Sequence, residues 1–517
     1  MMSALILLTA SLGTKAVAAE SSVFESQASM KSTNEIDRLV FGRLERLKIA
    51  PANLCSDAVF VRRVFLDVIG TLPTPDEAAQ FMTSAAPDKR GALIDQLLER
   101  EEFADYWAMK WSDLLRIKAE FPIDLWPNAA QGYHHWIRAA LHDNMPYDKF
   151  ARALLTASGS NFRDPPVNFY RAMQNRDPQG IAQTVALTFM GARADQWPKE
   201  RLTGMSAFFS RVGYKYTGEW KEEIVFYDPD STNVQHTAVF PDGKPARLYV
   251  DLDPREVFAN WLIDNRNPWF AANAANRVWF WLLGRGITQE PDDSRTDNPP
   301  SNPELLAYLE HELVSAGYDL KHLYRLILNS KTYQLSSIPK SRRPEATANF
   351  AQYPIRQLDA EVLADALNHV TGTTEHYISI IPEPYTIVPE DVRSIALPDG
   401  SISSAFLEMF GRPPRDTGQA SERNLKATAS QRLHLLNSSH VQRKLQQSPT
   451  LQALIRDRTT PRQLDSAIYL LILSRNPTDE ELSTVATWTQ STREQRNQAA
   501  LDLAWALVNS TEFLYRH

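Results

Sequence analysis

The chain has 517 residues, a formal net charge of −7, 43% hydrophobic residues and a single cysteine. This length allows about three domains, each large enough to bury a core of its own. Lysine and arginine (55) do not outnumber aspartate and glutamate (62), which argues against nucleic acid as a partner. The lone Cys55 excludes an intramolecular disulfide and a Cys-x-x-Cys-His haem attachment.

The first residues are typical of an export signal. Residues 4–13 form an apolar run too short to span about 30 Å of hydrocarbon, and Ala16-Val17-Ala18 is a small-x-small cleavage pattern. We therefore expect a signal peptide over residues 1–19 and a mature protein in the periplasm or outside the cell. Because no later segment approaches about 18 consecutive apolar residues, we expect no transmembrane anchor.

Helix signals dominate the mature chain, so the predicted fold class is mainly α, with multi-helix domains. Apolar residues recur every three or four positions over residues 36–47 and again over 60–68, where Gly70 ends the pattern. Capping boxes, in which two side chains satisfy free backbone N–H groups of the first turn, predict three more helix starts: Thr74-Pro75-Asp76-Glu77, Asp253-Pro254-Arg255-Glu256 and Thr478-Asp479-Glu480-Glu481.

Two stretches break the helical pattern. Residues 224–227 and 234–240 are rich in β-forming residues, and Pro241-Asp242-Gly243-Lys244 is a turn sequence, which predicts a small β-hairpin or sheet at about 222–252. Residues 376–403 contain too many prolines for a helix and predict an extended connector. We expect an N-terminal helical domain over 30–215, a β-rich connector over 216–252, a central helical part over 253–375, an extended connector over 376–403 and a C-terminal helical part over 404–517.

Aromatic and histidine clusters have both structural and functional interpretations. Trp261, Trp269, Trp279 and Trp281 fall close together; indoles can stack on sugar rings, although packing in the core is the commoner role of such clusters. Adjacent helix positions such as His134-His135 point about 100° apart, and no further ligand completes a metal-binding spacing. We expect no metal site.

Charged residues inside apolar stripes are stronger candidates. Arg63 and Asp67 have the i, i+4 spacing of a helical ion pair, for which a structural salt bridge is the default interpretation. Asn276-Arg277 lies among large apolar residues, where a buried guanidinium needs a carboxylate or carbonyl partner. Asp292-Asp293 follows the flexible Gly284-Arg285-Gly286; paired carboxylates can perform acid/base chemistry, but in a loop they more often cap a helix or face water.

The chain resembles a known pair of domains over nearly its whole mature length. Residues 60–75, with Asp88-Lys89-Arg90 and Trp107, resemble the PSCyt domain of unknown function catalogued in planctomycetes. Its usual companion, the PSD domain, is similar to the later segments Asn267-Pro268-Trp269-Phe270, Asn276-Arg277-Val278-Trp279, Gly284-Arg285-Gly286, Phe410-Gly411-Arg412-Pro413 and Leu435-Leu436-Asn437-Ser438. The resemblance implies an exported protein, often encoded beside a secreted sulfatase-like protein in polysaccharide-degrading bacteria, and it implies no established reaction.

This chain departs from the resembled family at two cysteine-bearing segments. Many members carry a Cys-x-x-Cys-His-like segment where Ala192-Arg193-Ala194 stands here, and a Cys-x-Cys where Gln419-Ala420-Ser421 stands. Covalent haem and a thiolate metal site are therefore not expected, and no cofactor is predicted. If the two segments once formed a single site, Ala194 and Ser421 should lie close together in the structure.

The function that we expect is that of a non-haem binding or assembly protein of the envelope, with a polysaccharide ligand or a sulfatase-like partner. One alternative is a hydrolase of sulfated or other polysaccharides that uses Asp292, Asp293 or Glu422, with Arg277 and Arg423 holding anionic groups. A second alternative is electron transfer. Further candidate ligand-binding residues are Arg63, Asp67, Asn276 and Trp279. Carboxylates, arginine and tryptophan lining a deep cleft would favour the enzyme, whereas the same residues tied in salt bridges would favour a structural role.

Overall fold

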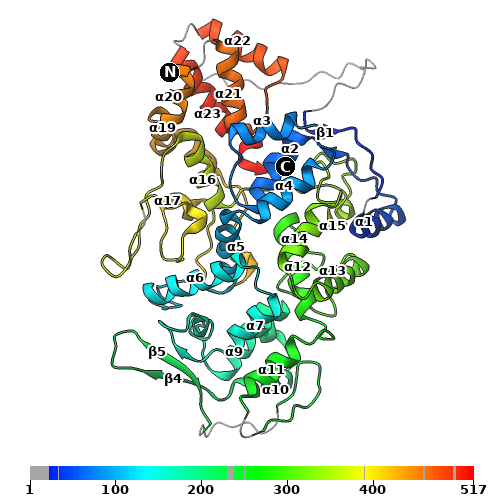
Figure 1. The fold of residues 1–517 in the computed structure, drawn as a ribbon, viewed down its shortest axis with the longest axis vertical. Helices are drawn as coiled ribbons and strands as arrows, with labels where there is room; N and C mark the ends of the chain where they lie inside the picture. The colour runs from blue at the N-terminus through cyan, green and yellow to red at the C-terminus, as the bar shows by residue number, and fades with distance from the viewer. Residues whose placement is uncertain are drawn as a thin grey trace.

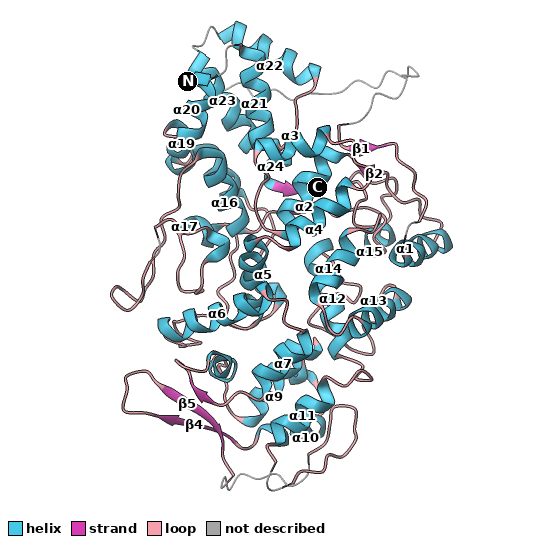
Figure 2. Cartoon of the chain, viewed as in Figure 1, coloured by secondary structure: helices cyan, strands magenta, loops and turns pink. Residues whose placement is uncertain are grey.

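The computed structural model describes residues 23–32, 34–229, 238–249, 252–388, 390–457, 460–492 and 496–517. The predicted signal peptide over 1–19 lies outside these residues. The described chain is mainly helical with only small sheets, as predicted, and its helices are distributed along an elongated molecule (Figures 1 and 2).

The N-terminal part is a run of packed helices that ends in a small sheet. Its helices are α1 (Glu35–Arg46), α2 (Asp57–Val68), α3 (Pro75–Thr83), α4 (Lys89–Leu98), α5 (Glu101–Leu114), α6 (Pro127–His142), α7 (Tyr147–Leu155), α8 (Asn168–Arg171), α9 (Pro178–Val185) and α10 (Lys199–Ser206). The stripes predicted over 36–47 and 60–68 are the buried faces of α1 and α2. The capping box of Thr74 and Glu77 starts α3, as predicted.

The predicted β-structure is present, but it begins earlier in the chain. Strands β4 (Val212–Tyr216) and β5 (Glu223–Tyr227) form an antiparallel hairpin, and β3 (Gly159–Ser160) pairs with the other edge of β5. The predicted strand 234–240 lies largely outside the described residues, and the turn at 241–244 supports only an isolated bridge between Val239 and Pro245. The start was misplaced because β4, with its glycine and its charged and tyrosine side chains, lacks a clear apolar alternation.

The second half of the chain returns to helices. They are α11 (Pro254–Leu262), α12 (Phe270–Leu283), α13 (Pro303–Ser315), α14 (Leu320–Leu328), α15 (Pro344–Ala348), α16 (Ala360–Thr371), α17 (Ala405–Met409), α18 (Ala429–Asn437), α19 (Ser439–Gln446), α20 (Pro449–Asp457), α21 (Pro461–Leu473), α22 (Asp479–Thr492), α23 (Arg496–Val508) and α24 (Thr511–Leu514). Reciprocal bonds between Thr478 and Glu481 form the predicted box at α22. At α11 the box is incomplete, because Asp253 caps Arg255 N and pairs with the Arg255 side chain.

Two short strand pairs join distant parts of the sequence. Strand β1 (Glu25–Ser26) pairs with β2 (Leu54–Cys55), and β6 (Arg356–Gln357) pairs with β7 (Tyr515–Arg516) at the end of the chain. The C-terminus therefore lies in the middle of the molecule, close to α2 and α4 (Figure 1).

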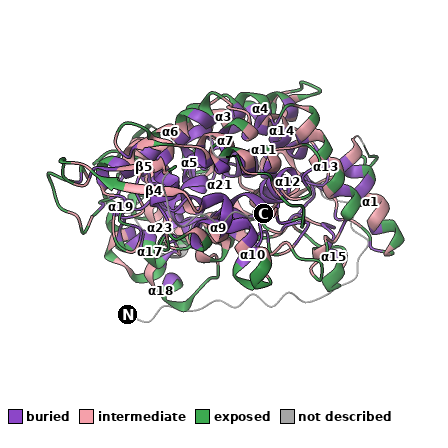
Figure 3. Ribbon diagram, turned by 90° about the horizontal axis from the view of Figure 1, so that it is seen from below, coloured by how far each residue is buried: buried purple, intermediate pink, exposed green. Residues whose placement is uncertain are grey.

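One hydrophobic core unites both halves of the described chain. A single cluster of buried side chains extends from Ile36 to Phe513, and the view from below shows buried segments through the interior with exposed turns at the edge (Figure 3). Trp107 and Trp111, which the sequence places on one helix face, are both in this core. None of the described helices is both long enough and apolar enough to cross a bilayer.

Candidate functional site

A pocket of about 240 Å³ lies at the centre of the molecule, where the two halves of the chain meet. Its walls come from α5, α12, β6, β7 and the loop over residues 413–425; α5 and α12 are near the middle of Figure 2. Apolar walls include Phe280 and Trp281, and the charged groups that line it are Lys110, Asp113, Arg277, Arg356, Asp359, Arg423 and Arg516. We call it the central pocket.

Asp67 of α2 does not line the pocket but contacts two of the arginines that do. One carboxylate oxygen contacts Arg356 Nη2 at 2.9 Å and Arg516 Nε at 3.0 Å, and the other accepts from the hydroxyls of Tyr333 (2.9 Å) and Tyr353 (2.7 Å). Because four groups contact this one buried carboxylate, two arginines of the second half of the chain are anchored to α2.

Asp359, which precedes α16, is the second anchor and is fully buried. It pairs with Lys110 at 2.8 Å, with Arg516 at 3.0 Å and with Arg423 at 3.4 Å. Burial opposes its ionisation, but these three cations together hold the pKa of Asp359 well below its usual range. Burial also lowers the pKa of Lys110 to about 8, although Asp359 opposes this shift.

Arg423 joins the loop over 413–425 to both halves of the chain. Its guanidinium contacts Asp113 of α5 at 2.6 Å and Glu361 of α16 at 2.6 Å. Burial opposes ionisation of Glu361, and Arg423 overcomes it and lowers the pKa of that carboxyl to about 2. Arg415 is held by Asp113 at 2.9 Å and Arg412 lies 3.5 Å from Glu361.

Arg277 of α12 also lines the pocket. Its Nη2 donates to Asp292 at 2.8 Å, and the second oxygen of Asp292 accepts from the backbone N–H of Ala420 at 2.6 Å. Arg277 is only 3% exposed, and its Nε has no hydrogen-bond partner among the described residues.

Positive charge exceeds negative charge in this network. The ion pairs connect seven cations, Lys110, Arg277, Arg356, Arg412, Arg415, Arg423 and Arg516, with five carboxylates, Asp67, Asp113, Asp292, Asp359 and Glu361. A buried cationic surplus favours an anion, and the planar fork of arginine suits a carboxylate or a sulfate.

The comparisons identify two adjacent families of unknown function. The PSCyt2 model, described as a protein of unknown function (DUF1549), matches residues 35–212, and the PSD1 model, described as a protein of unknown function (DUF1553), matches residues 254–489. The chain belongs to the paired PSCyt2 and PSD1 families. No curated protein and no solved structure matches it. The resemblance to a PSCyt and PSD pair is therefore confirmed.

The central pocket of this PSCyt2–PSD1 protein lies at the junction of the two matched regions. Asp67, Lys110 and Asp113 belong to the PSCyt2 region, whereas Arg277 and Arg356, like Asp359 and Arg423, belong to the PSD1 region. The charged network is thus a contact between the two families as well as the wall of a pocket.

Of the predicted candidates, Asp67, Arg277, Asp292 and Arg423 come together here. The predicted salt bridge between Arg63 and Asp67 is wrong: within the described chain, Asp67 pairs with Arg356 and Arg516. Arg63 instead donates to the carbonyls of Tyr333, Leu335 and His517. The i, i+4 spacing was misleading because both side chains are buried and each finds a stronger partner in distant parts of the chain.

Four other candidates lie outside the pocket. Trp279 is fully buried against Phe350. The Asn276 amide makes reciprocal bonds with the backbone of Thr288 and braces the loop after α12. Asp293 pairs with Arg295 at 2.8 Å. Glu422 accepts from the backbone N–H groups of Asp416 and Thr417, and burial raises the pKa of its carboxyl.

Each of the two segments that differ from the cysteine-bearing relatives has a contact with residues 290–294. Arg193 Nη2 lies 3.8 Å from a carboxylate oxygen of Glu290, and the backbone N–H of Ala420 donates to Asp292 at 2.6 Å. Gly191, which directly precedes the first segment, accepts from Ser294 N at 2.8 Å through its carbonyl. Gly191 has a φ of +59°, and an added Cβ would lie 2.7 Å from the Pro291 carbonyl, so only glycine fits this approach. Residues 290–294 thus contact both segments, and the closeness of Ala194 and Ser421 themselves stays a prediction.

Sequence reasoning missed Lys110, Asp113, Arg356, Asp359, Glu361 and Arg516 as site residues. Their pairs span long sequence separations, for example 249 residues between Lys110 and Asp359, so no local spacing indicates them. The available signal was weak: Lys110 stands between Met109 and Trp111 in a largely apolar stretch of sequence. Arg412 belongs to the segment Phe410-Gly411-Arg412-Pro413, which is similar to the PSD domain, but the sequence indicates no role for its side chain.

Proposed function

We propose that this protein is a non-haem binding protein of the bacterial envelope, exported to the periplasm or beyond, whose central pocket holds an acidic group of a polysaccharide. The ligand group is a sulfate or a uronic carboxylate. A sulfatase-like protein that acts on the same polymer is the partner that fits this role.

The observation that carries the proposal is the unsatisfied positive charge at the pocket wall. Five of the seven charged groups that line the pocket are cations, and the Nε of Arg277 is buried without a partner among the described residues. A buried guanidinium N–H without an acceptor is costly, and an anionic oxygen would satisfy it. Trp281 and Phe280 supply an apolar wall against which a sugar ring can pack.

The hydrolase alternative fits these contacts less well. A general acid or base needs a free oxygen beside the substrate, but both oxygens of Asp292 are engaged, by Arg277 and by Ala420 N. Asp293 and Glu422 do not line the central pocket. The candidate carboxylates therefore support binding rather than proton transfer.

The proposal is tested by calorimetric titration of the mature protein with glucuronate, galacturonate and glucose 6-sulfate, with glucose as the neutral comparator. We expect one or more of the acidic sugars to bind and glucose not to bind. Arg277→Lys keeps the charge beside Asp292 but loses the guanidinium fork, so it should weaken binding by about 10-fold or more.

Arg295→Lys is the matched control, because Arg295 pairs with Asp293 at the surface and does not line the pocket. It should leave the affinity unchanged. Equal binding of glucose and the acidic sugars, or an affinity that Arg277→Lys does not alter, would contradict the proposal. Stoichiometric haem in the purified protein would contradict its non-haem character.

Lys110 gives the binding a characteristic pH dependence. Its pKa is about 8, so the pocket loses one positive charge as the pH rises through 8. Because the ligand is anionic, its affinity should fall between pH 7 and pH 9. In Lys110→Met this fall should be absent; an identical pH profile in the variant would show that Lys110 does not face the ligand.

A further inference from the structure

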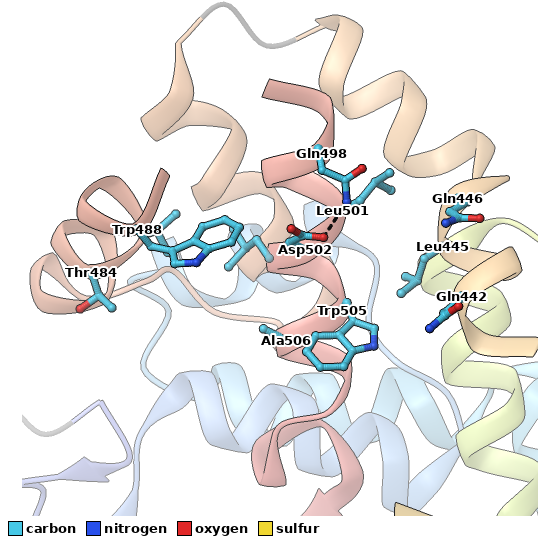
Figure 4. A pocket seen from close by; sticks show the side chains of 12 residues that line it. Gln442, Leu445, Gln446, Thr484, Trp488, Gln498, Leu501, Asp502, Trp505 and Ala506 are labelled. Carbon is cyan, nitrogen blue, oxygen red and sulfur yellow. Dashed lines mark hydrogen bonds between the residues drawn. The ribbon is translucent and has the colours of Figure 1, made fainter. Parts of the chain in front are cut away.

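A second pocket, far larger than the central one, lies on the C-terminal helices. It has a volume of about 680 Å³, and its lining residues come from α19, α22 and α23. Helix α23 forms the floor, and α22 and α19 stand on either side of it (Figure 4). We call it the C-terminal groove. Its size is within the range of about 300–1,000 Å³ that is usual for small-molecule sites.

The floor of the groove is one continuous face of α23. Gln498, Leu501, Asp502, Trp505 and Ala506 follow the i, i+3, i+4, i+7, i+8 spacing of a helix face, and all of them line the groove. Such a face normally packs against another helix. Here it borders open volume.

Two tryptophans give the groove its apolar surfaces. Trp488 of α22 is 37% exposed, and its ring lies toward the floor of the groove; Trp505 is a partly buried residue of the floor (Figure 4). A partly exposed indole ring that lies toward a groove can present an apolar face to a ligand. The C–H faces of a pyranose ring are complementary to such a surface.

The polar lining matches hydroxyl groups. Gln442 and Gln446 project from α19, and the amide of Gln498 donates to Asp502 at 2.8 Å (Figure 4). A primary amide both donates and accepts, and a carboxylate accepts, so together they can pair with neighbouring hydroxyls of a sugar. The apolar face of a partner helix would bury these groups without hydrogen bonds, at a cost.

The described lining of the groove differs in charge from that of the central pocket. Among the described residues that line it, none is lysine or arginine, and Asp502 is the one ionisable group. Within this described lining, an anionic ligand would meet a carboxylate and no cation. The favoured ligand is therefore uncharged.

From these observations we propose that the C-terminal groove is a binding site for a neutral oligosaccharide, stacked on Trp488 and Trp505 and hydrogen-bonded by the glutamine amides and Asp502. This site is separate from the central pocket in place and in charge. The inference does not depend on the acidic-sugar proposal.

The test is calorimetry and tryptophan fluorescence on the full mature protein with cellohexaose, xylohexaose and mannohexaose. We expect at least one of the three to bind and to change the fluorescence. Trp488→Ala should weaken that binding 10-fold or more. The melting temperature of Trp488→Ala is measured beside its affinity to show that the variant is folded, and Trp505→Phe serves as a second, conservative variant that should weaken binding less.

Trp220→Ala is the matched control, since Trp220 is 62% exposed and lies between β4 and β5; it should bind as the parent does. The inference is overturned if none of the three hexaoses binds, or if the one that binds does so equally well to Trp488→Ala. Arg277→Lys should leave hexaose binding intact, which separates failure of this site from failure of the central pocket.

Discussion

At the scale of single residues, the molecule depends on buried charges that are shared between several partners. Asp67 is the clearest case, because its two oxygens serve two arginines and two tyrosine hydroxyls at once. Such a carboxylate adds little net stability while it is paired, but its removal leaves unpaired buried charge.

Replacement of Asp67 by asparagine should lower the free energy of unfolding by about 3–5 kcal/mol, because Arg356 and Arg516 lose a common anion in the interior. Urea denaturation followed by circular dichroism measures this loss. Asp95→Asn removes an exposed carboxylate that pairs with Arg325 and should cost at most about 1 kcal/mol. Equal effects of the two variants would refute this account of Asp67.

His134 makes the stability depend on pH. Burial, with further contributions from Arg415 and His135, lowers the pKa of His134 to about 3 from 6.5. Below pH 6.5 the unfolded chain therefore binds a proton at His134, whereas the folded chain does not. The free energy of unfolding consequently falls as the pH is lowered below 6.5.

For His134 alone this loss is about 1.4 kcal/mol per pH unit below 6.5. His134→Phe should flatten the curve of unfolding free energy between pH 6.5 and 4.5 by about 3 kcal/mol relative to the parent. The control is His142→Phe, at a residue whose pKa is raised by Asp143 and Glu101; it should not flatten the curve. A parent-like slope in His134→Phe would contradict the prediction.

At the scale of elements, the sequence predicted those features that depend on residues close together in the chain. The starts of α3 and α22 follow from Thr74 and Thr478 with a glutamate three residues later, and the stripes of α1 and α2 follow from apolar spacing. The prediction failed where partners are distant: Arg63 and Asp67 share a helix but not a bond, and the cations of the central pocket come from segments that no spacing connects.

The capping boxes give an element-scale prediction. Thr74→Ala removes the hydroxyl that accepts from Glu77 N and should destabilise the protein by about 1 kcal/mol. Thr83→Ala, at the last residue of the same helix, removes a hydroxyl that donates to the carbonyl of Ala79 and should change stability by less than about 0.5 kcal/mol. Thermal or urea unfolding of the two variants measures this difference. Equal losses of stability in Thr74→Ala and Thr83→Ala would contradict the capping role of Thr74.

At the scale of the whole molecule, the two matched regions share one hydrophobic core and one network of ion pairs. A single core cluster includes side chains from both, and the ion pairs of Asp67, Lys110 and Asp113 all reach partners after residue 350. Arg63 Nε of α2 donates a hydrogen bond to the backbone carbonyl of His517 at 2.8 Å, which connects His517 to α2. The buried charged side chains of each region therefore have ion-pair partners in the other region.

A fragment that ends at residue 212 should therefore not reach the native state by itself. It retains the buried carboxylates and Lys110 but lacks Arg356, Asp359, Arg423 and Arg516, so its interior charges and the apolar faces around them would meet water. We expect broad, non-cooperative thermal unfolding and strong binding of a hydrophobic dye. Co-expression with residues 213–517 should restore a soluble complex with a sharp transition, because the missing partners return. A lone fragment that unfolds as cooperatively as the full chain would show that the network across the junction is dispensable for folding, and would limit its role to shaping the central pocket.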